Sequence, residues 1–323
     1  MNQSVLHAFG PQAARILGLW DLMYWVCAAV FVLVILALLA AVLRRRPQGG
    51  DNLTDEEDLP GPPPPDTHRR LVKVIGAAVA ITVLILFVLL AASVATGRAT
   101  ASLAGDPLNL KLTGKQWWWQ VEYVDPVPSQ GITTANEIHI PVGRPVRIEL
   151  ESTDVIHSFW VPSLHGKKDL IPGYTTAIWI RADRPGIYRG QCAEFCGFQH
   201  AHMALLVIAD PPERFRAWAE AQRRPSAPPA TPEQVLGKYL VEHLPCANCH
   251  TVRGTQASGR LGPDLTHLAS RRTLAAGIMP NNRGHLGGWV LDPQSIKPGS
   301  LMPPTAMSSE SLQAVLAYLE ALR

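Results

Sequence analysis

Two short stretches contain residues whose types and spacing could do chemistry. The first, QCAEFCGFQHAHM, covers 191–203 and holds two cysteines, two histidines and a methionine. The second, CANCH, covers 246–250. Thiolate, imidazole and thioether groups are the ligands that soft metals take from proteins. Four of the five cysteines lie in these stretches and Cys27 lies alone in an apolar run, which favours cofactor binding over a disulfide framework.

The CANCH stretch predicts a covalently bound haem. Cys246 and Cys249 could bond to the haem vinyl groups, and His250 would become an axial iron ligand. A C-x-x-C pair alone could also be a redox dithiol or half of a zinc site, but the histidine that follows directly favours haem. A methionine as the second axial ligand would raise the reduction potential. The candidates are Met279, Met302 and Met307. Met302 is preferred because the prolines of PGSLMPP hold the backbone extended.

The first stretch fits a copper loop. Cys196, His200 and Met203 have the spacing C-x-x-x-H-x-x-M, which supplies a thiolate, an imidazole and a weak thioether ligand in a β-sandwich loop. A second imidazole has to come from a distant strand. His157, in STDVIHSFWVP, is expected at the end of an alternating strand and is the candidate.

Cys192 adds a second thiolate to the same loop, and this changes the expected metal site. Two thiolates can bridge two coppers, each of which then takes one imidazole and one weak ligand. The resulting ligand set is His157, Cys192, the carbonyl of Glu194, Cys196, His200 and Met203. A disulfide between the two cysteines would leave the other ligands without a purpose, and zinc rarely takes methionine. The count therefore favours a binuclear copper centre.

Other aromatic and histidine residues carry weaker signals. KQWWWQVEY places Trp117 and Trp119 on one face of an expected strand and Trp118 on the other. These rings could be packing residues, or one exposed indole could couple an incoming electron to the copper; the spacing does not decide. His202 is expected at the rim of the loop, and His139 and His165 are expected to be surface or structural histidines.

Two apolar segments, about 20–43 and 72–94, are each long enough to cross a bilayer as a helix. The first has no basic stretch ahead of it and is too long for a signal peptide, so a retained anchor is expected. Basic residues border the segment between the spans, 44–71, which is acidic and then proline-rich. They are Arg44, Arg45, Arg46, Arg69, Arg70 and Lys73. This bias predicts a hairpin with a cytoplasmic loop and both termini outside.

The rest of the chain divides by pattern. Runs of period two separated by Pro/Gly turns predict a small antiparallel sandwich, and a helix and PSAPPA follow it. A capped helix start at Thr231 opens a helical domain. The expected division is 1–95 for the N-terminal segment and hairpin, 96–212 for the β domain, 213–230 for the helix and linker, and 231–323 for the helical domain. The formal net charge of +3 gives no reason to expect nucleic acid as a partner.

In combination, these motifs resemble the copper-bearing subunit II of haem-copper cytochrome c oxidases, in the branch with a fused C-terminal cytochrome c domain (caa-type). The resemblance covers nearly the whole chain, including GKQWWWQVEY, DVIHSFWVPSLHGKKDLIPG, QCAEFCGFQHAHM, CANCH and IKPGSLMPP. It implies a multidomain membrane protein with a transmembrane helical hairpin, an all-β cupredoxin domain of Greek-key type and an all-α class I cytochrome c domain. It also implies a bacterial inner membrane, with both cofactor domains on the periplasmic side.

The resemblance further implies roles for single residues. The six copper ligands named above would form the CuA centre, and the Glu194 carboxylate would reach a Mg ion at the interface with subunit I. Trp117 matches the tryptophan at which electrons enter, Asp154 matches an acidic residue beside the first histidine ligand, and His250 and Met302 would be the axial pair. The implied partners are subunits I and III and an external cytochrome c. Electrons would pass through haem c and CuA to subunit I, where oxygen is reduced.

One departure from the family pattern keeps other functions open. Members carry a glutamate near the cytoplasmic start of the second span, whereas this chain has HRRLVKVIGAAVA there, with no acid. The CuA subunit of a nitric oxide reductase is therefore the alternative function, and a copper carrier without a catalytic partner is a third. A quinol oxidase subunit is disfavoured because that branch has lost the copper ligands present here.

Overall fold

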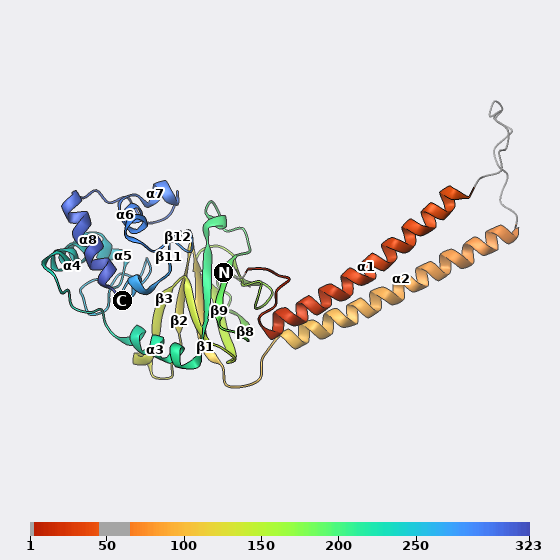
Figure 1. Ribbon diagram of the computed structural model, residues 1–323, viewed down its shortest axis with the longest axis horizontal. Helices are drawn as coiled ribbons and strands as arrows, with labels where there is room; N and C mark the ends of the chain where they lie inside the picture. The colour runs from red at the N-terminus through yellow and green to blue at the C-terminus, as the bar shows by residue number, and fades with distance from the viewer. Residues whose placement is uncertain (1–2, 45–64) are drawn as a thin grey trace, which may run out of the picture. The chain divides into compact units, whose positions relative to one another are not determined.

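The computed structural model describes residues 3–44 and 65–323 (Figure 1). The expected loop between the spans, including Arg45 and Arg46, falls largely outside the described residues. By its contacts the chain forms two units, one from 15–99 and the other from 1–14 with 100–323. The predicted division into two long apolar helices, an all-β sandwich and a helical domain is confirmed.

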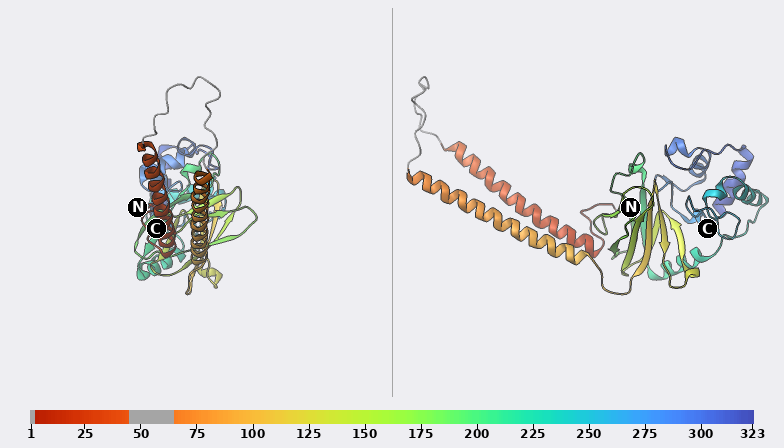
Figure 2. Two further views of the ribbon diagram at one scale, coloured as in Figure 1. Left: turned by 90° about the vertical axis from the view of Figure 1, so that its right-hand side faces the viewer. Right: turned by 180° about the vertical axis from the view of Figure 1, so that it is seen from behind.

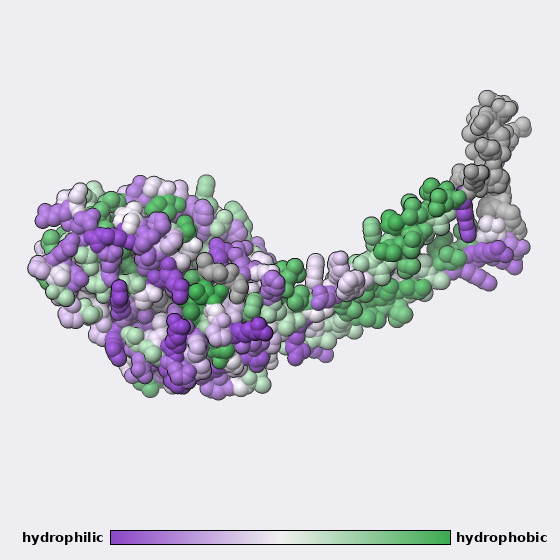
Figure 3. Space-filling view, in the orientation of Figure 1, coloured by the Kyte–Doolittle hydropathy of each residue, from purple (hydrophilic) through white to green (hydrophobic). Residues whose placement is uncertain are grey.

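The first unit is a pair of long apolar helices, α1 (Pro11–Leu43) and α2 (Pro65–Thr100). Both are long and apolar enough to cross a membrane, and the most apolar window of each has no buried residue. Side chains of high hydropathy cover both helices in the space-filling view (Figure 3). Because α2 begins at Pro65, its first turn includes Asp66, an acid that the expected span boundary had left outside.

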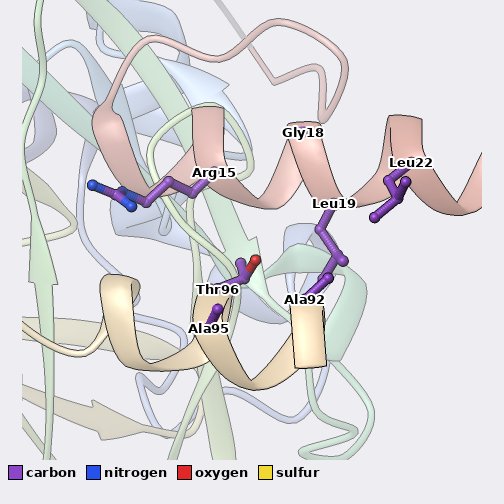
Figure 4. Close-up of a pocket in the computed structure, with 7 residues that line it drawn as sticks. All are labelled: Arg15, Gly18, Leu19, Leu22, Ala92, Ala95 and Thr96. Atoms are coloured by element: carbon purple, nitrogen blue, oxygen red, sulfur yellow. The ribbon is translucent and has the colours of Figure 1, made fainter. Parts of the chain in front are cut away.

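A shallow hollow lies between the two helices. Leu19 and Leu22 of α1 line it opposite Ala92 and Ala95 of α2, and Leu19 points toward Ala92 (Figure 4). Small side chains on α2 let the helices approach here, as is common between membrane helices. Apart from Arg15 and Thr96 the lining is apolar or glycine, so the hollow reflects helix packing and not a site for chemistry.

The β domain is a sandwich of two five-stranded sheets. One sheet has the order β3-β2-β1-β5-β8 and the other β4-β10-β9-β6-β7. The strands of the first sheet are β1 (Leu108–Lys115), β2 (Trp118–Tyr123), β3 (Ile132–Ala135), β5 (Val146–Ser152) and β8 (Thr176–Ile180). Those of the second are β4 (Glu137–Pro141), β6 (His157–Trp160), β7 (Lys168–Leu170), β9 (Gly186–Cys192) and β10 (Ala204–Asp210).

The alternating pattern predicted the buried face well but not the direction of every strand. Val146, Ile148 and Leu150 are buried while the residues between them are half-exposed, so one face of β5 fills the core. The pairs β1 with β5 and β4 with β10 are parallel, contrary to the antiparallel expectation. The chain leaves β1 for three other strands before it returns as β5, and a connection of that length permits parallel pairing.

The C-terminal domain is helical, with one ladder of two-residue strands, β11 (Thr273–Leu274) and β12 (Met279–Pro280). The helix α3 (Pro212–Arg223) precedes this domain. The helices of the domain are α4 (Pro232–His243), α5 (Cys246–Cys249), α6 (Arg283–Leu291), α7 (Pro293–Ile296) and α8 (Ser309–Ala321). They form one group in Figure 2. As the sequence indicated, Thr231 caps α4 by accepting from Gln234 N at 3.2 Å. A buried cluster that includes Val241, Val315 and Leu319 joins α4 to α8.

Candidate copper and haem sites

The copper-loop residues converge at one end of the sandwich. Cys192 ends β9, Met203 directly precedes β10, and the loop between these strands carries the remaining residues of QCAEFCGFQHAHM. His157 comes from 35 positions before Cys192 and begins β6. It therefore starts a strand, where the sequence interpretation had placed it at the end of one.

The two thiols form the centre of this cluster. Their sulfur atoms are 3.7 Å apart, far beyond the S–S bond length of about 2 Å, and both cysteines are free. Cys192 Sγ is 3.8 Å from His157 Nδ1, and Cys196 Sγ is 3.6 Å from His200 Nδ1. Each sulfur thus has its own imidazole. His157, Cys192 and Cys196 are all buried, with ligand atoms that lie within 4.8 Å of one another.

Each sulfur also has one weaker donor within reach. Cys196 Sγ is 3.9 Å from Met203 Sδ, and Cys192 Sγ is 3.2 Å from the carbonyl oxygen of Glu194. The six predicted donors therefore form two similar halves around the sulfur pair. Two thiolates, two imidazoles, a thioether and a carbonyl suit copper better than zinc.

The electrostatics of the metal-free pair are asymmetric. The nearby thiol of Cys196 is the largest cause that lowers the pKa of Cys192 to about 3; His157 and backbone groups act in the same direction and outweigh burial. Next to that thiolate, and buried itself, Cys196 has a raised pKa. Two like charges this close do not both form without a cation, so a metal ion that bound both sulfur atoms would displace the proton of Cys196.

Asp154 orients the His157 ring from the side opposite the sulfur atoms. The ring Nε2 lies 2.8 Å from Asp154 Oδ1, which leaves Nδ1 directed at Cys192. Burial disfavours the imidazolium, but hydrogen bonds to Cys192 and Asp154, together with their charges, outweigh it and raise the pKa of His157. A carboxylate that fixes a ligand histidine in this way is a common second partner in metal sites.

Two residues outside the predicted ligand set shape the centre. A Cβ on Gly114 of β1 would come within 2.7 Å of the His157 ring, so glycine makes room for the imidazole. Glycine inside a strand is a signal for such a close approach, and sequence reasoning could have used it. Gln116 Nε2 donates to the Cys196 carbonyl at 2.7 Å, a role for which the sequence carries no signal.

Trp117 lies against the same loop. Its indole Nε1 donates to the Cys196 carbonyl at 2.9 Å, and the residue is only 9% exposed. Trp117 was expected on a strand but lies in the turn before β2. Burial still alternates along the three tryptophans, because Trp119 is buried and Trp118 is half-exposed. His202 is exposed at the edge of the loop. His139 bonds to Asp210 at 2.9 Å as a structural histidine.

The Glu194 carboxylate forms an ion pair at the surface of the loop. It is partly exposed and lies 3.5 Å from the Lys167 ammonium. One carboxylate is a minimal contribution to a magnesium site, since that ion prefers several oxygen ligands and retains water. Any such site would need further ligands from another chain or from water.

The predicted haem-attachment residues lie near the start of the helical domain. Cys246 and Cys249 begin and end α5, both partly exposed and unpaired with one another. His250 Nδ1 donates to the Pro263 carbonyl at 2.7 Å, so Nε2 is left as the ligand atom. A Cβ on Gly262 would come within 2.5 Å of the His250 ring, so the segment GPDL, which covers 262–265, packs directly on the imidazole. Burial lowers the pKa of His250, which favours the neutral ligand form.

The three candidate methionines differ in their packing. Met279 is buried in the core cluster of the domain, and Met307 is partly buried against it. Within the described residues, Met302 is outside that cluster and only partly buried, in the loop between α7 and α8. Gln294 Nε2 fixes its backbone by donating to the Met302 carbonyl at 2.8 Å. Met302 is thus the methionine that the core does not use, and the residues present fit a haem c.

Comparison with known proteins gives matches in both domains. A family model described as "Cytochrome C oxidase subunit II, periplasmic domain" matches residues 129–209, and one for cytochrome c matches residues 234–323. Cytochrome c oxidase subunit 2 of Alkalihalophilus pseudofirmus is 39% identical over 248 residues, which is 74% of this chain and 70% of that one.

One further relative and one solved structure also match parts of the chain. Cytochrome c oxidase subunit 2 of Bacillus sp. strain PS3 is 31% identical over 66% of this chain and 62% of its own length, so the match spans less than two thirds of that protein. Among solved structures, the periplasmic domain of subunit II of cytochrome oxidase of Bradyrhizobium japonicum has a TM-score of 0.35 at 29% identity. That match covers 38% of this chain and 97% of that one.

Proposed function

Because this chain belongs to the family of cytochrome c oxidase subunit II, we propose that it is the subunit at which electrons enter a respiratory terminal oxidase. Electrons pass from an external cytochrome c, by way of the haem c and CuA sites of this chain, to the haem-copper site of subunit I, where oxygen is reduced to water. The chain carries electrons and does no bond chemistry itself.

The pair of sulfur atoms is the observation that supports this proposal most strongly. A copper pair bound there would accept and release single electrons. The chain supplies two cysteine sulfur atoms 3.7 Å apart that would hold such a pair, with one imidazole beside each. It also buries His157 and both cysteines, which keeps water away and lets the protein set the potential. A mononuclear carrier would have no use for Cys192.

The haem site contributes separately. His250 is held in one tautomer by Pro263, and Met302 is the proposed second axial ligand because the core leaves it available. A thioether ligand would raise the haem potential relative to a second histidine. Trp117 would then couple the two sites, since its indole donates to the backbone carbonyl of Cys196, one of the proposed copper ligands.

The remaining assignments concern the surroundings of the chain. We place α1 and α2 across a bacterial inner membrane against subunit I, with subunit III nearby and both cofactor domains on the periplasmic side. Arg44, Arg69, Arg70 and Lys73 lie at the helix ends that would face the cytoplasm. The Glu194 carboxylate would complete a Mg site only together with groups of subunit I.

A CuA subunit of a nitric oxide reductase remains the second candidate. The observation in its favour is that no acid occurs in HRRLVKVIGAAVA at the start of the second span. Asp66, in the first turn of α2, weakens that argument because it could supply a carboxylate at the same end of the helix.

Purification of the native membrane complex separates the two functions. With reduced cytochrome c as the donor, we expect the complex to consume oxygen and to leave nitric oxide largely unreacted. A complex that consumed only nitric oxide would overturn the leading proposal and establish the second.

A further inference from the structure

Lys297, from the segment that leads to Met302, is buried against the copper domain. It is only 2% exposed, and its Nζ donates to the carbonyls of Trp117 at 2.7 Å, His202 at 2.8 Å and Ala275 at 3.1 Å. An ammonium has three N–H donors, and all three have acceptors here. Two of these carbonyls belong to the cupredoxin domain, so one lysine of the cytochrome domain ties the two together.

Glu137 makes the reverse connection. This residue of β4 is 3% exposed, and its Oε1 accepts from Arg272 N at 2.7 Å, Thr273 N at 3.0 Å and Thr273 Oγ1 at 3.3 Å. Burial raises the pKa of Glu137, and the backbone donors from the cytochrome domain oppose that shift. A buried charge is costly unless its hydrogen bonds are satisfied, and here the other domain satisfies them.

Neutral contacts also join the two domains. Ala204 N, at the start of β10, donates to the Ala276 carbonyl at 2.9 Å, and Gln199 Nε2 donates to the Pro298 carbonyl at 2.8 Å. A Cβ on Gly277 would come within 2.9 Å of the Ala204 side chain, so only glycine permits this approach. The linker is also bound, since Ser226 N donates to the Arg253 carbonyl at 3.0 Å.

The contacts of Trp117 show what this arrangement achieves. One edge of its indole bonds to the Cys196 carbonyl. On another side, a Cβ on Gly299 would lie 3.6 Å from the ring, which places the segment that leads to Met302 against it. Trp117 is therefore enclosed between the copper loop and the proposed haem-ligand loop.

We infer that Lys297 and Glu137 form a two-point lock that holds the cytochrome domain on the copper domain in one orientation, with Lys297 as a positioning residue for Trp117. Trp117 is then an internal contact between the two cofactor sites, and an external donor has to dock on the cytochrome domain. The part that concerns electrons rests on the proposed function, whereas the lock itself does not.

Amide hydrogen exchange of the full-length chain in its native complex tests the lock. We expect the amides of Ala204, Arg272 and Thr273 to be protected in the native protein. Lys297→Met should lower protection of Arg272 and Thr273 by roughly tenfold or more, although Lys297 touches neither amide. Glu137→Ala should lower protection of Ala204 in the same way. Lys238 is a partly exposed lysine of α4. Lys238→Met is therefore the matched control and should leave the protection of all these amides unchanged.

Two different results of the exchange experiment would contradict the lock. Rapid exchange of these amides in the native chain would mean that the cytochrome domain moves freely, and losses confined to each side chain's own partners would mean that there is no lock. If one variant does not fold, the other variant and the native protein still decide between the two results.

A second readout is the rate of single-electron transfer from reduced haem c to oxidised CuA. Lys297→Met should slow this transfer while the absorption spectra of both sites stay unchanged. A complex that failed to reduce oxygen would disprove the proposed function without affecting the exchange result.

Discussion

The indole Nε1 of Trp117 donates a hydrogen bond to the backbone carbonyl of Cys196 over 2.9 Å. Gln116 Nε2 donates to the same oxygen at 2.7 Å. Two neighbouring residues of the turn between β1 and β2 therefore hold the peptide of Cys196, which links the position of Trp117 to the geometry of the sulfur pair.

Trp117→Phe should separate the electronic role of the indole from its structural role. The substitution removes one of the two donors, so we expect a loss of about 1 kcal/mol in the free energy of unfolding and an unchanged copper spectrum. Transfer from haem to copper should become slower. Trp118→Phe, on the half-exposed face, is the control in flash-induced kinetics. Equal rates in the two variants would remove Trp117 from the path.

Copper affinity of the metal-free protein should rise with pH. Cys196 has a raised pKa because it lies next to the Cys192 thiolate and is buried, so the metal-free state holds a proton that the copper-bound state has lost. Fewer protons in the bound state mean tighter binding at higher pH, by about tenfold per pH unit for each proton released. Competition with a chromophoric copper(I) chelator between about pH 6 and 8 measures the slope. A copper affinity independent of pH would contradict the proposal that Cys196 holds a proton in the metal-free protein.

His250→Ala should remove the low-spin haem spectrum and leave copper binding intact. The imidazole is the proposed iron ligand, and its Nδ1 bond to Pro263 is the contact that orients it. His243→Ala serves as the control because His243 is exposed in the same domain and bonds to the Tyr239 carbonyl. A low-spin spectrum that survived in His250→Ala would disprove the ligand assignment.

Met302→Leu should lower the reduction potential of the haem, because a thioether ligand is lost. Met279→Leu conserves volume in the core, so it should cost less than about 1.5 kcal/mol and leave the potential unchanged. Redox titration of the two purified variants checks both expectations. A shift in Met279→Leu alone would transfer the ligand role to Met279.

Much of the site was predictable because its residues are close in sequence or chemically distinctive. Cys192, Cys196, His200 and Met203 lie on one loop, so their spacing already restricts the metals that they could bind. His157 was identified by the ligand count that a copper pair requires, and the structure brings its Nδ1 to 3.8 Å from Cys192 Sγ. Alternating burial in β5 likewise follows from side-chain period alone.

What the sequence did not predict depends on contacts between distant segments. Nothing local marks Lys297 as a buried residue, since its three acceptors come from 180, 95 and 22 positions away. The parallel pairing of β1 with β5 depends on how the intervening chain crosses between the sheets. The full length of α2 was also not predictable from hydropathy, because polar residues such as Asp66 extend the helix beyond its apolar segment.

Electron paramagnetic resonance of the copper-loaded protein is the most direct test of the central claim, that Cys192 and Cys196 bridge two coppers. The native protein should show the hyperfine pattern of one unpaired electron shared equally by two copper nuclei. Cys192→Ser should abolish this pattern, while Cys27→Ser, in the apolar helix α1, should retain it. A shared-electron spectrum that persisted in Cys192→Ser, or a single-copper spectrum in the native protein, would contradict the binuclear centre.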